Sequence, residues 1–393
     1  MLSATVLIKG AELYTPEYLG QQDILLLNGK IVKIAPVINQ QTLVELFPEL
    51  EVYEAQGLIA VPGIVDIHVH FNGAGGEGAP QFRTPPTQLS ELTTAGITTA
   101  VGLLGTDGIT RSLNDLYMKA RALENEGLST WIYTGSYQIP SPTFTDNLSL
   151  DIALIDKVVG LKIAFSDHRC SHPDNDSFAQ AVSASRVGGI IGGKCGKVMI
   201  HMGTPANGLA RISEILASTA IPLNQVIPTH LNRSEDVFNA ATEYALAGGN
   251  VDVSAGVSEK YYFPGAVKPS VAIARFLAAG VPVGRITMSS DGNGVMTVFN
   301  EDGTSKMLVS PVKAMFEEFR DMILEGVPIT DALRVVATNP STLLALPNKG
   351  KIQVGFDADI LLIDKDIKLQ TVFARGQKMV DKNKVLIKGV FEA

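Results

Sequence analysis

The chain has 393 residues, of which 46% are hydrophobic and 18% charged, and this composition fits an ordered α/β protein and excludes a disordered or fibrous one. Its net charge of −8 and its pI near 5.3 argue against an extended nucleic-acid-binding surface. The two cysteines, Cys170 and Cys195, are too few for a disulfide framework, and we find neither a signal peptide nor an apolar stretch of about 20 residues, so we expect a cytoplasmic protein without a membrane span.

Short β-strands are predicted at both ends of the chain. Near the start, apolar runs lie at 6–8, 24–27 and 31–34. The last two runs flank Asn28-Gly29, and Asn-Gly between apolar runs is the strongest short-range hairpin signal. Near the end, similar runs lie at 360–363, 371–374 and 384–387. We therefore expect residues 1–60 and 350–393 to form one composite β domain.

Strands and helices alternate in the middle of the chain. The predicted strands lie at 64–70, 97–104, 130–137, 158–164, 197–202, 226–231, 250–254 and 286–291. Helices separate them, and one begins at the cap Ser112 and ends at Gly127, whereas another begins at Ser234 and ends at Gly248. Eight such units predict a (β/α)8 barrel over residues 61–349. A doubly wound open sheet is the alternative, but no phosphate-binding glycine motif supports it.

Four of the six histidines follow this strand pattern. His68 and His70 lie two residues apart in a strand, so both side chains are expected on one face, although a lone His-x-His also fits a solvent-facing strand. His201 and His230 stand at the ends of two later strands. Four imidazoles at one barrel mouth would be costly without a cation, so we predict a metal site.

Two further residues extend this candidate site. Lys162 lies in the apolar run 158–165, where a buried ammonium is expensive unless the side chain reaches the rim, is paired, or has taken up CO2 as a carbamate. Asp291 ends the eighth strand within Asp291-Gly-Asn-Gly294, which is either a simple turn or a metal ligand that also acts as general base. Its place at the rim favours the second interpretation.

The six residues resemble the metal ligands of the amidohydrolase superfamily. They are His68, His70, Lys162, His201, His230 and Asp291. Further similarity comes from Val61-Pro-Gly-Ile-Val-Asp-Ile-His-Val-His70, from Ala337-Thr-Asn-Pro340 and from residues 350–364. The resemblance covers the length of the chain. It implies two divalent ions, expected to be Zn²⁺, bridged by carboxylated Lys162 and hydroxide, and a small β-sandwich formed by the two chain ends.

Residues between these ligands resemble the isoaspartyl (β-aspartyl) dipeptidase family, which cleaves dipeptides joined through the aspartate side chain. Glu77 matches the residue that receives the substrate's α-amino group. Arg169 and Arg233 follow two of the ligands, and their guanidinium groups match the geometry of a peptide carboxylate. The alternative is that each arginine pairs with a neighbouring acid such as Asp167 or Glu235.

The resemblance extends to smaller contacts. Tyr137 matches the residue that donates to the scissile carbonyl oxygen. Gly75 and Thr106 match positions that hold the aspartyl α-carboxylate, and Gly76 is counted with them as substrate-binding. Val295 departs from the family pattern, in which serine is expected, and this departure affects the contacts at the amino end of the substrate.

The implied reaction is metal-dependent hydrolysis of the isopeptide bond of β-aspartyl dipeptides. The bridging hydroxide attacks the amide carbonyl, and Asp291 accepts a proton and passes it to the leaving amine. The first alternative is a cyclic amide hydrolase of the same superfamily, similar to dihydroorotase or hydantoinase, and the second is a non-catalytic scaffold. The resemblance also implies a homo-oligomer and allows an octamer. His168 and His172 are expected in a loop near the mouth.

Overall fold

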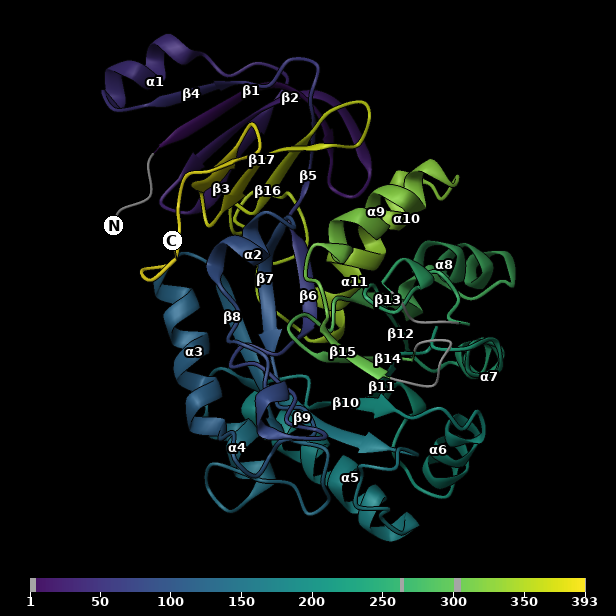
Figure 1. The fold of residues 1–393 in the computed structure, drawn as a ribbon. Helices are drawn as coiled ribbons and strands as arrows, with labels where there is room; N and C mark the ends of the chain where they lie inside the picture. The colour runs from purple at the N-terminus through teal and green to yellow at the C-terminus, as the bar shows by residue number, and fades with distance from the viewer. Residues whose placement is uncertain (1–4, 262–264, 300–304, 393) are drawn as a thin grey trace.

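The computed structural model describes residues 5–261, 265–299 and 305–392. It has two parts, a curved parallel sheet surrounded by helices and a mixed sheet that lies against one end of it (Figure 1). Within the described residues, no helix is both long and apolar enough to cross a membrane.

The parallel strands follow one another in chain order, so there is no strand-order reversal of the kind that a doubly wound sheet requires. Six of them form one sheet: β6 (Ile64–Val69), β7 (Ile97–Gly102), β8 (Ser129–Gly135), β9 (Val158–Phe165), β10 (Lys197–Met202) and β11 (Val226–Thr229). Two more, β12 (Val251–Ser254) and β13 (Ile286–Ser289), pair with each other. All eight predicted strands are therefore present, with ends that differ by a few residues.

Hydrogen bonds connect the β12–β13 pair to both edges of the six-stranded sheet. On one side, the amide of Leu231 donates to the carbonyl of Asp252 at 3.3 Å. On the other, the amide of His70 donates to the carbonyl of Gly292 at 2.9 Å. The sequence prediction is confirmed in its coarser form, an α/β fold with a strongly curved parallel sheet.

Helices follow the strands and cover the outside of the curved sheet (Figure 1). The longer ones are α3 (Leu113–Asn125), α5 (Asn175–Gly192), α6 (Asn207–Ala217), α7 (Glu235–Leu246), α8 (Pro269–Ala278) and α9 (Ala314–Leu324). The shorter ones are α2 (Leu89–Thr93), α4 (Leu148–Leu154), α10 (Ile329–Leu333), η5 (Arg334–Thr338) and α11 (Asn339–Leu343), with single turns at η1 (Pro80–Phe82), η2 (Leu223–Gln225), η3 (Glu259–Tyr261) and η4 (Val283–Arg285). Helix α1 (Gln40–Leu46) instead packs on the mixed sheet (Figure 1). The predicted caps are confirmed: Ser112 accepts from the Asp115 amide, and Ser234 accepts from the Val237 amide.

Two apolar layers hold the curved sheet in place. The outer layer joins the strands to the helices and includes Leu116, Leu123 and Phe178. The inner layer contains side chains from six consecutive strands: Val65, Ile67, Val101, Tyr133, Val159, Met199 and Ile227. Residues of six neighbouring strands can form one cluster only where the sheet is curved around them, so this layer is the floor beneath the candidate site.

The two chain ends form a single mixed sheet. Its strands are β1 (Val6–Tyr14), β2 (Tyr18–Leu27), β3 (Lys30–Ala35), β4 (Glu51–Glu54), β5 (Ile59–Pro62), β16 (Ile360–Ile363), β17 (Leu369–Ala374), β18 (Gln377–Asp381) and β19 (Lys384–Val385). The junction between the two ends is the antiparallel pairing of β5 with β16. The structure thus describes one nine-stranded sheet, whereas the expected β-sandwich of two sheets remains a prediction.

A hairpin absent from the sequence prediction lies between β13, the last parallel strand, and α9. It consists of β14 (Val295–Phe299) and β15 (Ser305–Val309). The hairpin directly follows Asp291-Gly-Asn-Gly294, which places it beside the candidate site.

Candidate metal centre and substrate cavity

The six predicted metal ligands lie in or just after the parallel strands. They are His68 in β6, His70 after β6, Lys162 in β9, His201 in β10, His230 after β11 and Asp291 after β13. The four histidines and the lysine are at most 4% exposed. The site therefore lies at the carboxyl ends of the strands, where the barrel prediction places it.

A β-bulge in β6 directs the histidine pair into the site. The pairing of β6 with β7 shifts between Asp66 and Val69, where the β6 strand contains one residue more than its partner. Val65, before the bulge, and Ile67, within it, face the inner apolar layer, whereas Val69 belongs to the outer layer. The extra residue breaks the alternation of side chains, so the even-numbered His68 and His70 face inward.

Asp291 lies between the two histidines of this pair. Its Oδ1 is 3.3 Å from Nε2 of His68 and 3.1 Å from Nε2 of His70. One ligand atom from each of the three side chains lies within 4.8 Å of the others. Nζ of Lys162 is 3.4 Å from Nε2 of His68, so the lysine joins the same cluster.

The remaining two histidines continue this cluster. The ring centroids of His68 and His230 are 5.1 Å apart, and those of His230 and His201 are 4.6 Å apart. Burial lowers the pKa of His68, His201 and His230 well below the usual value, so these rings are neutral at pH 7. Neutral imidazole is the form that binds metal ions.

Buried nitrogen atoms without hydrogen-bond partners indicate that this donor set fits a cation. Nδ1 of His230 lies 2.6 Å from Oγ of Ser254, which orients the ring, whereas its Nε2 is buried and has no partner among the described residues. Leaving a buried polar atom unpaired costs about 1–3 kcal/mol. Imidazole nitrogen and carboxylate oxygen are ligands that divalent transition metals accept, and a bound ion would satisfy this atom.

Two of the predicted ligands have strained backbone conformations. His230 has φ of 65° and Asp291 has φ of 54°, both in the left-handed region that side chains with a Cβ rarely adopt. Such strain costs about 1–3 kcal/mol and clusters at functional sites. Here it turns each side chain inward directly after its strand ends.

Lys162 is fully buried, and burial lowers the pKa of its amine to about 7. A substantial fraction of the amine is therefore uncharged at neutral pH. The uncharged amine is the form that can add CO2, so the environment of Lys162 fits the carbamate interpretation better than that of a lysine reaching toward the rim.

Tyr137 is placed beside a predicted metal ligand. Its hydroxyl lies 2.7 Å from Nδ1 of His201, to which it donates when the proton of the ring is on Nε2. Burial raises the pKa of this phenol well above its usual value, so Tyr137 remains a hydrogen-bond donor at all physiological pH values. The structure thus brings the predicted oxyanion donor to the ligand cluster.

Arg169 pairs with two acids. Its Nε lies 2.8 Å from Oδ1 of Asp167 and one terminal nitrogen lies 2.9 Å from Oδ2, which makes a two-point ion pair. Its other terminal nitrogen lies 3.2 Å from Oε1 of Glu77. Arg169 thus forms the pair with Asp167 that the alternative interpretation describes, and its other terminal nitrogen is directed at Glu77 in the cavity.

Arg233 does not pair with Glu235. Glu235 instead forms a two-point pair with Arg275, at 2.7 and 2.9 Å. A terminal nitrogen of Arg233 donates to the carbonyl of Met202 at 3.0 Å, and the arginine lines the same cavity as Asp291.

The predicted aspartyl-carboxylate contacts lie on two neighbouring loops. Gly75 and Gly76 have φ of 82° and 96°, and a Cβ on Gly75 would lie 2.2 Å from the carbonyl of Phe82, so only glycine fits there. Oγ1 of Thr106 is buried without a hydrogen-bond partner among the described residues. Such a hydroxyl is available to a ligand, although Thr106 does not line the cavity below.

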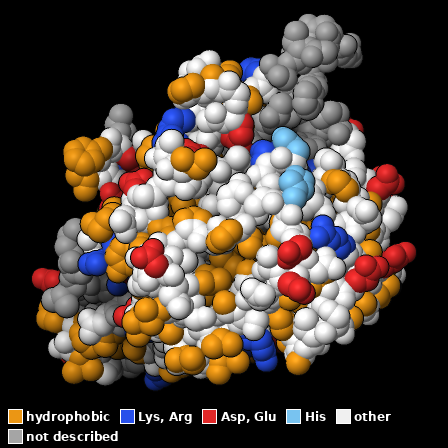
Figure 2. Space-filling view, turned by 90° about the horizontal axis from the view of Figure 1, so that it is seen from below, with side chains coloured by type: hydrophobic (Ala, Val, Ile, Leu, Met, Phe, Trp, Pro, Cys, Tyr) orange, Lys and Arg blue, Asp and Glu red, His pale blue; other side chains and the backbone are white. Residues whose placement is uncertain are grey.

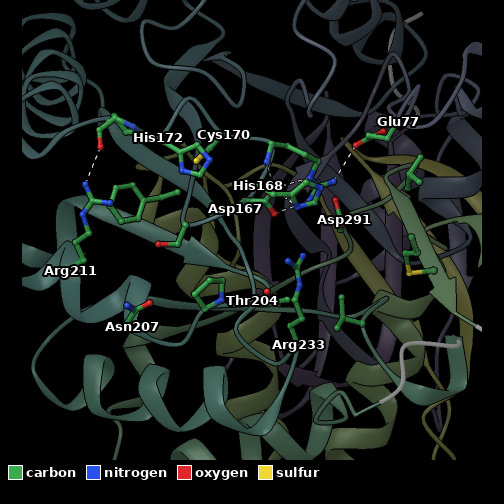
Figure 3. A pocket seen from close by; sticks show the side chains of 18 of the residues that line it. Glu77, Asp167, His168, Cys170, His172, Thr204, Asn207, Arg211, Arg233 and Asp291 are labelled. Carbon is green, nitrogen blue, oxygen red and sulfur yellow. Dashed lines mark hydrogen bonds and ion pairs between the residues drawn. The ribbon is translucent and has the colours of Figure 1, made fainter. Parts of the chain in front are cut away.

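A cavity of about 980 Å³ is lined by Asp291 of the ligand cluster (Figure 3). Its charged lining includes Glu77, Asp167, Arg169, Arg233 and Asp291. His168 and His172 also line it, which confirms their predicted loop near the mouth. Histidine side chains reach the molecular surface in Figure 2, and the side chain of His168 is 86% exposed.

The hairpin supplies an apolar wall that the sequence did not reveal. Val295, Met296 and Met307 line the cavity, so the residue at the departure from the family pattern faces the predicted substrate. Asp167 is likewise absent from the predicted site residues and enters the sequence prediction only as an alternative partner of Arg169. The sequence signal for a role in the site is its position two residues after β9 and two residues before Arg169.

Comparison with known proteins places these features in context. A family model described as "Amidohydrolase family" matches residues 196–391. A crystal structure of the β-aspartyl dipeptidase from Fervidobacterium islandicum AW-1, in complex with β-Asp-Leu dipeptide, is 38% identical, with a TM-score of 0.87, and covers 97% of this chain and 98% of that one.

More distant matches show the breadth of the fold. A D-hydantoinase (dihydropyrimidinase) from Thermus sp. superposes with a TM-score of 0.71 at 15% identity, covering 98% of this chain and 97% of that one. The dihydroorotase of Aquifex aeolicus is 48% identical over 56 residues, which is 14% of this chain and only 12% of that relative's length.

Proposed function

The chain belongs to the amidohydrolase family, and on that premise we propose that it is a metal-dependent dipeptidase that hydrolyses the isopeptide bond of β-aspartyl dipeptides. The observation that carries the proposal is one cavity lined by Asp291 of the ligand cluster, the anionic Glu77 and the cationic Arg169 and Arg233. A dipeptide joined through its aspartate side chain has a free ammonium, two carboxylates and an amide between them, which match these groups.

The proposed cofactor is a pair of divalent ions, with Zn²⁺ as the expected metal. The proposed ligands are His68, His70, His201, His230, Asp291 and Lys162 as its carbamate, which would bridge the two ions. When bound, the metal supplies Lewis acidity and lowers the pKa of a water to about 7. The unpartnered Nε2 of His230 and the lowered pKa of Lys162 support this donor set.

We assign the two ends of the substrate to opposite charges in the cavity. Glu77 accepts the α-ammonium group, and Arg233 and Arg169 bind the carboxylate of the leaving amino acid. Because two nitrogens of Arg169 already bind Asp167, it offers the substrate the terminal nitrogen that now contacts Glu77. Substrate binding therefore replaces the Glu77–Arg169 pair by two ion pairs to the ligand. Gly75, Gly76 and Thr106 are the proposed contacts of the aspartyl carboxylate.

Two residues handle the reacting amide. Asp291 lies within hydrogen-bond reach of both His68 and His70 at the base of the cavity and is the proposed general base and then general acid. It takes a proton from the attacking water and gives it to the departing amine. The protonated Tyr137 donates to the carbonyl oxygen as negative charge develops there.

A cyclic amide hydrolase remains a second candidate, favoured by the short match to dihydroorotase. The full-length similarity to the Fervidobacterium enzyme and the Glu77–Arg169 arrangement favour the dipeptidase. A scaffold without activity does not require a cluster of five buried ligand residues and a partly buried Asp291. We further propose that the six-stranded sheet and the β12–β13 pair form one closed barrel over residues 61–349, with residues 1–60 and 350–393 as the second domain, in a homo-oligomer.

The direct test is leucine release from β-aspartyl-leucine by metal-free protein and by protein supplied with zinc and bicarbonate. The proposal predicts release only by the metal-loaded protein, and none from α-aspartyl-leucine. Equal release from both isomers would contradict the assigned specificity, and release from neither by protein with metal bound would contradict the function.

A further inference from the structure

We propose that Asp167 is a positioning residue that controls both halves of the site, the ring nitrogen that His201 presents to the ligand cluster and the guanidinium nitrogen that Arg169 presents to the substrate carboxylate. The Arg169 half of this proposal rests on the proposed function, whereas the His201 half requires only that the cluster binds metal.

The first contact concerns His201. Oδ2 of Asp167 lies 3.0 Å from Nε2 of this ring, and a carboxylate can only accept a hydrogen bond, which favours a proton on Nε2. A terminal nitrogen of Arg169 lies 3.1 Å from the same Nε2, but it already donates to Oδ2 of Asp167. Nδ1 is then the nitrogen that carries the electron pair, and in the structure it accepts a hydrogen bond from the hydroxyl of Tyr137 at 2.7 Å, whose place a metal ion would take. A carboxylate behind a histidine thus selects the tautomer and orientation needed for a metal ligand.

The second contact concerns Arg169. The two oxygens of Asp167 bind its Nε and one terminal nitrogen, so the plane of the guanidinium is fixed. The backbone amide of Arg169 also donates to Oδ1 at 2.8 Å, which holds the acid and the arginine in one tight turn. Only the terminal nitrogen that contacts Glu77 is left for the predicted substrate carboxylate.

Asp167 is suited to this dual role because it is buried and fully used. It is 6% exposed, and both of its oxygens accept hydrogen bonds. Asparagine has the same shape, but its amide nitrogen would face a donor of Arg169 or of His201. Asp167→Asn must therefore lose at least one of these contacts, without a change in side-chain volume.

The test measures metal binding and catalysis separately for Asp167→Asn. We expect its zinc affinity, measured by competition with a chromophoric chelator, to fall about 10–100-fold. We expect its KM for β-aspartyl-leucine to rise about tenfold or more, and its KM for β-aspartyl-leucinamide, which lacks the carboxylate, to stay within about twofold. The matched control is Asp156→Asn, which removes an exposed carboxylate just before β9 and should change neither quantity.

A double-mutant cycle shows whether Asp167 acts through the arginine. In an Arg169→Met background, Asp167→Asn should no longer raise the KM for β-aspartyl-leucine, but it should still weaken zinc binding. If Asp167→Asn does not fold, as judged by circular dichroism, Asp167→Glu replaces it, because the added methylene displaces the same charge from both contacts.

The outcomes are separable. Zinc affinity and KM both within about twofold of wild type would overturn the proposal, and a change in only one would overturn the dual role. If the wild-type protein does not cleave β-aspartyl-leucine, the proposed function fails, and the zinc titration still decides the His201 half.

Discussion

The hydroxyl of Tyr137 lies 2.7 Å from Nδ1 of His201, so the predicted oxyanion donor and a predicted metal ligand share one hydrogen bond. The phenol is oriented before any substrate binds, because the guanidinium of Arg169 also packs on the Tyr137 ring. The central carbon of the guanidinium lies 5.4 Å from the centroid of that ring. An oriented donor in a buried site is the arrangement that stabilises a developing oxyanion most strongly.

Tyr137→Phe keeps the ring and removes this donor. We expect kcat for β-aspartyl-leucine to fall about 10²–10³-fold with little change in KM. The control is Tyr133→Phe, because the hydroxyl of Tyr133 is also buried but has no hydrogen-bond partner among the described residues. Steady-state kinetics that show equal losses for both variants would refute the role of Tyr137.

Lys162 provides a pH-dependent prediction. Because burial lowers the pKa of this amine to about 7, the neutral form is a minority at pH 6 and predominates at pH 8. Reactivation of metal-free protein by zinc, at a fixed concentration of dissolved CO2, should therefore become about tenfold faster between these two pH values. Lys162→Met should not reactivate at either. A rate that is constant or falls with pH would contradict carbamate formation.

Glu77→Gln tests the assignment of the substrate ammonium. The change removes a charge-assisted hydrogen bond of about 1.5–3 kcal/mol, so KM for β-aspartyl-leucine should rise about 10–100-fold. Succinyl-leucine, which lacks the α-amino group, should be cleaved by Glu77→Gln about as well as by wild type. A comparable loss with both compounds would mean that Glu77 has a structural role.

The junction between the two parts of the molecule depends on a buried ion pair. Nζ of Lys349 lies 2.7 Å from a carboxylate oxygen of Asp357 and of Asp359, and it also contacts Ser129 at the start of β8. Removing one partner leaves a buried charge, so Lys349→Met should destabilise the fold by about 3–5 kcal/mol.

Urea unfolding followed by circular dichroism measures this effect. The control is Lys368→Met, whose pair with Asp366 is solvent-exposed and should contribute about 1 kcal/mol or less. Equal unfolding midpoints for the two variants would contradict the importance of the buried pair.

The sequence predicted the strands and the ligand residues well because both depend on local patterns. Apolar runs of the right length predicted β6 to β13, and histidines at their ends predicted the ligand cluster. The inward direction of His68 and His70 depends on the bulge between Asp66 and Val69, which is visible only in the pairing with β7. The period-two argument placed the pair on one face but could not determine which face.

Other features depend on contacts between distant segments. Pairing of Arg169 with Glu77 joins residues 92 positions apart, and no local pattern encodes it. The hairpin of β14 and β15 follows a glycine-rich turn that predicted only a close backbone approach, so its contribution of Met296 and Met307 to the cavity was not predicted.

The most direct test of the central claim compares two substrates on one zinc-loaded preparation, β-aspartyl-leucine and dihydroorotate. Because the cavity presents charges for both ends of an open dipeptide, we expect kcat/KM for β-aspartyl-leucine to exceed that for dihydroorotate by about 10⁴-fold or more. Faster opening of dihydroorotate would contradict the dipeptidase assignment and identify a cyclic amide hydrolase.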